Sequence, residues 1–121
     1  MSGNSLLQIQ QEFTTLNIKN HNMEAKERNL FKRCIAKWGT RNQFDQANEE
    51  MAELMIELHK IRRGRAIGLD DLASEVADVS IMIDQIRVVY GPDFEEVVAI
   101  QREHKIKRLE GRVGDINHKG N

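Results

Sequence analysis

The sequence predicts an all-α protein, folded as a bundle of four to five helices. Its 121 residues include a single Pro, while Glu, Lys, Leu, Ile and Ala are frequent, a composition typical of helical proteins. Apolar side chains recur at three- and four-residue spacing in several segments, the pattern of a helix with one buried face. Gly39 and the pair Gly91-Pro92 separate these segments. A chain of this length forms one domain with a modest core.

The charge balance and the absence of special segments narrow the class of protein. Lys and Arg number 18 against 19 Asp and Glu, which does not suggest a nucleic-acid partner. No stretch approaches the roughly 18 apolar residues of a membrane span, and the N-terminus lacks the layout of a signal peptide. Cys34 is the only cysteine, so a disulfide framework and a CxxC zinc site are excluded. We expect a cytoplasmic protein.

The first two segments lead into the bundle. Residues 1–21 form an N-terminal extension with scattered apolar positions, which we expect to hold at most a short helix. Asn22 is the expected cap of a helix that runs to about Lys37 and ends at Gly39. The buried face of this helix is predicted to comprise Leu30, Phe31, Cys34, Ile35 and Trp38.

The third helix is expected from Thr40 or Asn42 to about Arg63. At about 100° per residue, its apolar stripe comprises Phe44, Ala47, Met51, Leu54, Met55, Leu58 and Ile61. A second stripe of Glu50, Glu53 and Glu57 lies directly beside the apolar one. A solvated acidic stripe usually lies opposite the apolar face. These carboxylates are therefore expected to point into a groove between helices.

The fourth helix is expected to start at a cap, Asp70, and to run to about Tyr90. Its predicted buried stripe comprises Leu72, Val76, Val79, Ile83 and Ile86. Glu75 lies almost within that stripe and Asp78 lies beside it. A bare carboxylate is costly to bury unless it is paired or bound to a metal.

The last helix is expected to begin at Pro92 and to reach about Arg112. Residues 113–121 have the composition of a flexible tail. The helical domain therefore spans residues 22–112, between the extension and the tail.

Two acidic pairs on consecutive helices mark the candidate site. Glu50 with Glu53, and Glu75 with Asp78, each place two carboxylates three residues apart on one helix face. A short connection makes the two helices antiparallel neighbours, so the four carboxylates are expected to converge on a hard divalent cation. Acidic pairs at this spacing are also common by chance in so acidic a chain, so a solvated acidic face stays open as the alternative.

The same residues resemble a known family. The segments Lys37-Trp38-Gly39, Gln43, 49–54, 74–79 and 79–85 are similar to the MazG-like nucleoside triphosphate pyrophosphohydrolases. These are all-α proteins of a superfamily that also contains the dimeric dUTPases, and their signature is EExxE followed by ExxD. The resemblance covers about residues 30–110.

The resemblance implies a reaction and roles for the acidic residues. The implied ligands of Mg²⁺, or of Mn²⁺ as a substitute, are Glu50, Glu53, Glu75 and Asp78. The family reaction cleaves a nucleoside triphosphate between the α- and β-phosphorus and gives a nucleoside monophosphate and pyrophosphate. Glu53 is the expected residue to orient the attacking water or take its proton. Glu49 is the alternative, or a partner that orients the ligands.

The resemblance also implies substrate contacts and an assembly. Lys105 and Arg108 match late basic residues that meet phosphates, although the family often has Asn where this chain has His104. Trp38 and Gln43 lie where family members contact the base. The alternatives are a solvated helix end for the basic residues and a core position for Trp38. A homodimer or homotetramer is implied. From the charge balance and the lack of a long apolar stretch, we expect no nucleic-acid or membrane partner.

Two other classes of protein stay open. A helical interaction module would use its acids only as surface charge and bind no metal. A metal-binding bundle of different chemistry, such as a di-iron oxidase, would need Glu-x-x-His pairs, and no Glu lies three residues before a His in this sequence.

Overall fold

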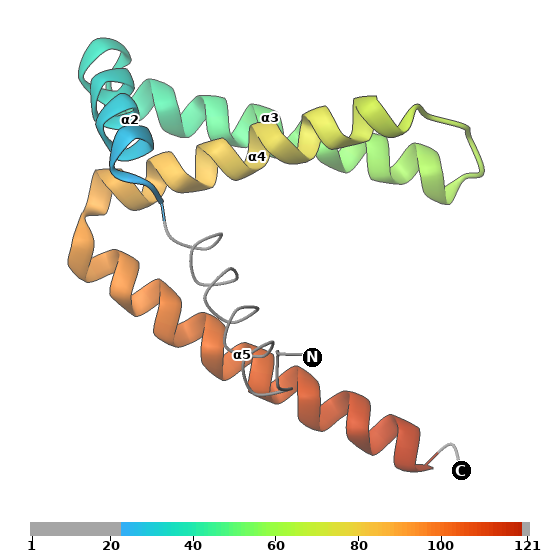
Figure 1. Cartoon of the computed structure of the whole chain (residues 1–121). Helices are drawn as coiled ribbons and strands as arrows, with labels where there is room; N and C mark the ends of the chain where they lie inside the picture. The colour runs from blue at the N-terminus through green and yellow to red at the C-terminus, as the bar shows by residue number, and fades with distance from the viewer. Residues whose placement is uncertain (1–22, 120–121) are drawn as a thin grey trace, which may run out of the picture.

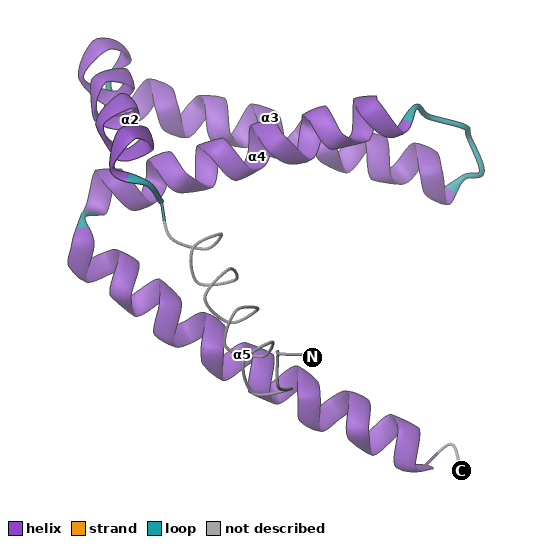
Figure 2. Ribbon diagram, in the orientation of Figure 1, coloured by secondary structure: helices purple, strands orange, loops and turns teal. Residues whose placement is uncertain are grey.

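The computed structural model describes residues 23–119, with side chains placed to residue 114; this part holds four helices and no strand. The helices are α2 (Ala25–Trp38), α3 (Thr40–Arg62), α4 (Leu69–Tyr90) and α5 (Pro92–Lys119) (Figure 2). α3 and α4 form an antiparallel hairpin, α2 crosses one end of it, and α5 diverges from α4 (Figure 1). The all-α prediction is confirmed for these residues. None of these four helices is long and apolar enough to cross a membrane.

The caps of α2 are partly those expected. Asn22, the predicted cap, lies outside the described residues, and the helix begins later, with Glu24 as its N-cap. The backbone N–H of Glu24 donates to the carboxylate of Glu27 at 3.1 Å, a local contact that helps to fix the start of the helix. Gly39 ends the helix as predicted, at a φ of 88° that suits glycine.

The turn between α3 and α4 spans residues 63–68 and sets the hairpin. Gly64 adopts a φ of 81°, and its N–H donates to the carbonyl of Ile61 at 2.9 Å. This bond satisfies a carbonyl that the end of α3 leaves free. The N-cap of α4 is Gly68 and not the predicted Asp70. Asp70 instead lies in the first turn, where its charge interacts favourably with the positive end of the helix.

The passage from α4 to α5 follows the sequence prediction, but the end of α5 does not. Gly91 (φ 91°) ends α4, and Pro92 opens α5. α5 then continues past the expected end near Arg112. Gly111 and Gly114 each weaken a helix by about 1 kcal/mol relative to Ala, but neither removes a backbone hydrogen bond, so the helix propagates through them. Flexibility of residues 113–121 stays a prediction.

The buried core is small and lies where α2 crosses the hairpin. Its members come from α2, α3 and α4 and comprise Phe31, Gln43, Ala47, Met82 and Gln85. The two glutamines form a buried amide pair in which Gln43 Nε2 donates to Gln85 Oε1 at 2.5 Å. This bond satisfies polar groups that would otherwise be costly to bury.

Part of the stripe of α4 that the sequence predicts to be buried is exposed, and it belongs to a broad apolar surface: Val76 is 51% exposed and Ile83 is 42% exposed. The hairpin apolar face, as we name it, comprises the exposed side chains Met51, Met55, Leu58, Val76, Ile83 and Tyr90. At about 100° per residue, the α3 members share one side of their helix and the α4 members share one side of theirs. The rings of Phe44 in α3 and Tyr90 in α4 stack with centroids 6.2 Å apart, which places both sides on the same face. None of the described helices covers this face, which is why the side chains stay exposed.

Candidate metal centre

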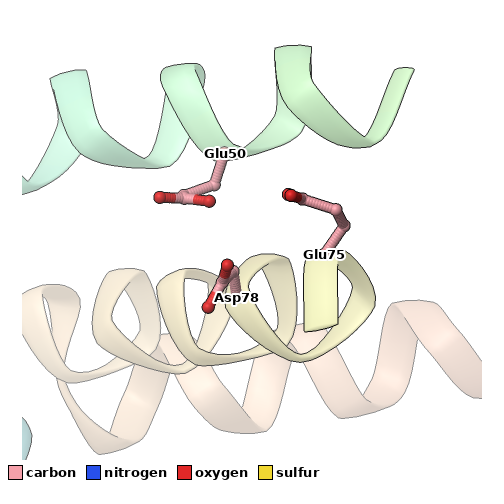
Figure 3. Close-up of side chains that lie close together, drawn as sticks. All are labelled: Glu50, Glu75 and Asp78. Atoms are coloured by element: carbon pink, nitrogen blue, oxygen red, sulfur yellow. The ribbon is translucent and has the colours of Figure 1, made fainter. Parts of the chain in front are cut away.

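Three of the four predicted carboxylates converge between the central helices. Glu50 comes from α3, and Glu75 and Asp78 come from α4. One oxygen of each lies within 4.8 Å of the others, and all three residues are partly buried. Figure 3 shows the three side chains turned toward one space between the helices. We call Glu50, Glu75 and Asp78 the carboxylate cluster.

The hairpin itself produces this convergence. Glu75 and Asp78 are three residues apart, so they share one side of α4. Glu50 follows the buried Ala47 by the same spacing, so it lies on the side of α3 that faces α4. The short turn at residues 63–68 holds the two helices antiparallel and brings these two sides together. Apolar packing between the helices therefore fixes the position of the acids.

Two oxygens of the cluster are buried without a partner. Glu50 Oε2 and Glu75 Oε2 accept no hydrogen bond from the described residues. A buried carboxylate oxygen that lacks a donor loses its hydration, and the nearby negative charges add repulsion. A bound cation would replace the lost hydration and offset the repulsion.

The donor set determines which cation fits. The three side chains offer only carboxylate oxygens, and no His or Cys joins the cluster among the described residues. Mg²⁺ prefers such oxygens together with waters and substrate phosphates, whereas Zn²⁺ prefers nitrogen and sulfur. The cluster thus fits a hard cation such as Mg²⁺ or Mn²⁺, and Glu50, Glu75 and Asp78 are the residues that would hold it.

Sequence reasoning missed one residue of this neighbourhood, Gln46. Its Nε2 donates to Glu50 Oε1 at 2.8 Å. The other oxygen of this carboxylate, Oε2, is the buried one without a partner. Gln46 lies four residues before Glu50 on α3, and side chains at this spacing meet on a helix surface. That spacing is the signal that could have identified it.

Glu53 and Glu49 are exposed and lie outside the cluster. The negative charge of Glu50 is the main cause that raises the pKa of Glu53 above its usual value. Partial loss of hydration and the charges of Glu75 and Glu49 act in the same direction. The negative charges of the cluster therefore act on Glu53. Its role as a fourth ligand or a base stays a prediction, as does the role of Glu49.

The predicted substrate contacts are scattered in the structure. Trp38 is 52% exposed, with the Lys37 ammonium 5.5 Å from its ring centroid. It is thus not a core residue of the described chain. Gln43 is buried, and its amide donates a hydrogen bond to Gln85. Lys105 and Arg108 are exposed on α5, a helix that contributes nothing to the cluster. Substrate contact by these residues stays a prediction.

A cavity adjoins the carboxylate cluster. It has a volume of about 380 Å³ and lies between the end of α3, the turn and the start of α4. Glu75 belongs to both the cavity and the cluster, and Ser74 and Lys60 also line the cavity. Lys60 Nζ lies 3.2 Å from Glu57 Oε1, so this cation is paired with an acid of the same helix. The cavity gives a ligand access to one side of the cluster.

Fold and site together define an all-helical protein with a carboxylate cluster inside a helical hairpin. Comparison with known proteins adds no family to this description: no family model, no curated protein and no solved structure matches the chain.

Proposed function

We propose that this protein is a Mg²⁺-dependent nucleoside triphosphate pyrophosphohydrolase of the MazG-like kind. Water hydrolyses the anhydride bond between the α- and β-phosphorus of a nucleoside triphosphate: its oxygen bonds to one of these phosphorus atoms, the bridging bond breaks, and the products are a nucleoside monophosphate and pyrophosphate. The observation that carries the proposal is the carboxylate cluster with its two buried, partnerless oxygens. The match of the same residues to the EExxE and ExxD signature supports it.

The residues of the chain have distinct tasks in the proposed reaction. Glu50, Glu75 and Asp78 hold the cation; when bound, Mg²⁺ neutralises the charge of the phosphates and activates a water. Glu53, at the edge of the cluster, orients the water or accepts its proton.

The proposed assembly is a homodimer or homotetramer. The hairpin apolar face supports it, because its six members are exposed and none of them carries a charge. The centres of protein interfaces are depleted of charged residues in the same way. A symmetric contact between two copies would bring this same apolar face of each chain together.

The test of the reaction is pyrophosphate release from a panel of ribo- and deoxyribonucleoside triphosphates, with Mg²⁺ and with Mn²⁺. We expect at least one nucleotide to be hydrolysed, with a rate that depends on the cation. The Glu50→Gln/Glu75→Gln variant removes two ligand charges and is expected to lose more than about 100-fold of the rate, since even residues that only orient ligands are worth 10- to 100-fold. Glu110→Gln, an exposed acid on α5, is the matched control.

The outcomes separate the proposed function from its alternatives. Release that persists in the Glu50→Gln/Glu75→Gln variant would contradict the proposed site. No release from any nucleotide by a folded chain that binds Mg²⁺ would contradict the reaction and favour a metal-binding bundle of different chemistry. A folded chain that neither releases pyrophosphate nor binds a cation would favour a helical interaction module. The exposed hairpin apolar face also suits this class.

A further inference from the structure

We propose that Gln46 is a positioning residue for the carboxylate cluster: it holds Glu50 by one oxygen and leaves the other free for the cation. This inference rests on the proposed cation site. It concerns a residue outside the acidic signature, one position before the buried Ala47 on α3.

The first step of the argument is the division of labour between the two oxygens of Glu50. Oε1 accepts the hydrogen bond from Gln46 Nε2 at 2.8 Å, whereas Oε2 is buried and has no partner within residues 23–114. The amide must present its nitrogen here, because its oxygen would repel the carboxylate at this distance. The bond therefore fixes which oxygen of Glu50 is left for a ligand.

The second step is the contrast with the other two carboxylates. Among the described residues, no side-chain hydrogen bond or ion pair reaches Glu75 or Asp78. Glu50 is thus the one member of the cluster that a neighbouring side chain holds in place. A glutamate has three rotatable bonds, and restricting them before a ligand arrives lowers the entropic cost of binding.

The third step is the chemistry of an amide in this position. A Lys or Arg at residue 46 would also bind Glu50, but its positive charge would repel the cation. Glutamine donates a hydrogen bond without adding charge. Neighbours that orient a metal-binding carboxylate in this manner typically contribute 10- to 100-fold to metal affinity.

Calorimetric titration with Mn²⁺ tests the proposal on the full chain. Gln46→Met keeps the length of the side chain but lacks the donor, and we expect its Kd for Mn²⁺ to rise about tenfold. Asn48→Ala is the control, because it removes an exposed amide of α3 that no described side chain binds, and its Kd is expected to stay unchanged. Gln46→Lys keeps a donor and adds a charge, and we expect it to bind Mn²⁺ more weakly than Gln46→Met.

Two further readouts distinguish positioning from a general loss of structure. The melting temperature of Gln46→Met without metal is expected to match that of the native chain, while its increase on adding Mn²⁺ becomes smaller. In a pyrophosphate assay, the Mg²⁺ concentration for half-maximal rate is expected to rise about tenfold, with kcat at saturating Mg²⁺ nearly unchanged.

Two results would overturn the inference in different ways. A native chain that binds Mn²⁺ and a Gln46→Met variant that binds it equally well would exclude the positioning role and leave the proposed function intact. A native chain that binds neither Mn²⁺ nor Mg²⁺ would exclude both the positioning role and the proposed function.

Discussion

At the scale of single residues, the carboxylate cluster destabilises the folded chain locally. Glu75 and Glu50 each bury an oxygen without a partner, next to other negative charges. Such groups destabilise a folded chain, and proteins retain them mainly where a ligand or a reaction needs them. Their presence in the centre of a well-formed hairpin separates this cluster from an ordinary acidic surface.

The first prediction concerns the stability of the metal-free chain. Glu75→Gln removes a partly buried charge, so we expect the free energy of unfolding without metal to rise by roughly 1 kcal/mol. Mg²⁺ is then expected to stabilise the variant less than it stabilises the native chain. Urea unfolding with and without Mg²⁺ measures both effects. A metal-free variant that is less stable than the native chain would contradict the view that Glu75 is strained.

The second prediction concerns the amide pair of the core. Gln85→Leu leaves the buried amide of Gln43 without its partner, and we expect a loss of about 1–3 kcal/mol in the free energy of unfolding. The double variant Gln43→Leu/Gln85→Leu removes both polar groups and is expected to be more stable than Gln85→Leu alone. A double-mutant cycle in urea measures the coupling. Additive effects would mean that the two amides do not depend on each other.

At the scale of helices, the sequence predicted the residues that end a helix better than the N-cap residues that begin one. Gly39 and Gly91-Pro92 end helices where the sequence predicts. Glycine readily adopts the positive φ found at a helix end, and proline lacks the N–H that a helix interior needs. Asp70 was wrong as a cap, since Gly68 is the N-cap of α4. Several residues near a helix start can cap it, and the packing of the whole helix selects among them. Composition also missed the continuation of α5 past Arg112.

An ion pair links α2 to α5 and gives the third prediction. Arg28 donates two hydrogen bonds to Glu95, at 2.5 and 2.8 Å, and these bonds hold the pKa of Glu95 below its ordinary value of 4.5. The folded chain therefore binds this proton more weakly than the unfolded chain. The stabilisation is present above pH 4.5 and is lost as the pH falls through the lowered pKa.

Glu95→Gln tests this linkage. At pH 7 we expect it to lower the free energy of unfolding by about 1 kcal/mol, because both partners are partly exposed and solvent weakens the pair. The difference from the native chain should shrink as the pH drops below 4.5. Glu96→Gln, an exposed acid beside it, is the control. A difference that stays constant down to pH 3 would exclude the ion pair as its cause.

At the scale of the whole molecule, the described chain is an open arrangement with a small core. Three apolar side chains are buried, Phe31, Ala47 and Met82, whereas the hairpin apolar face is exposed. Helical periodicity identified this face but could not tell what covers it, since a stripe buried within one chain and a stripe that faces another chain have the same pattern. Helical spacing was limited at the site as well. It predicted Glu50, Glu75 and Asp78, which do converge, but it could not show that Glu53 lies outside the carboxylate cluster.

The fourth prediction tests the proposed homo-oligomer. Met55→Glu and Ile83→Glu each place a charge on the hairpin apolar face, at side chains that are exposed in the described chain. We expect the native chain to sediment as a dimer or larger species and both variants to shift toward the monomer, because an unpaired charge is costly to bury in an interface. Glu103→Lys on α5 is the control. A native chain that is monomeric at tens of micromolar would contradict the proposal.

The central claim is that the carboxylate cluster between α3 and α4 binds a divalent cation, and Mn²⁺ titration followed by NMR tests it most directly. Bound Mn²⁺ broadens the amide signals of nearby residues. We expect the signals around Glu50, Glu75 and Asp78 to disappear first, and excess Mg²⁺ to restore them. Broadening that begins elsewhere, or none at all with a folded chain, would contradict the claim.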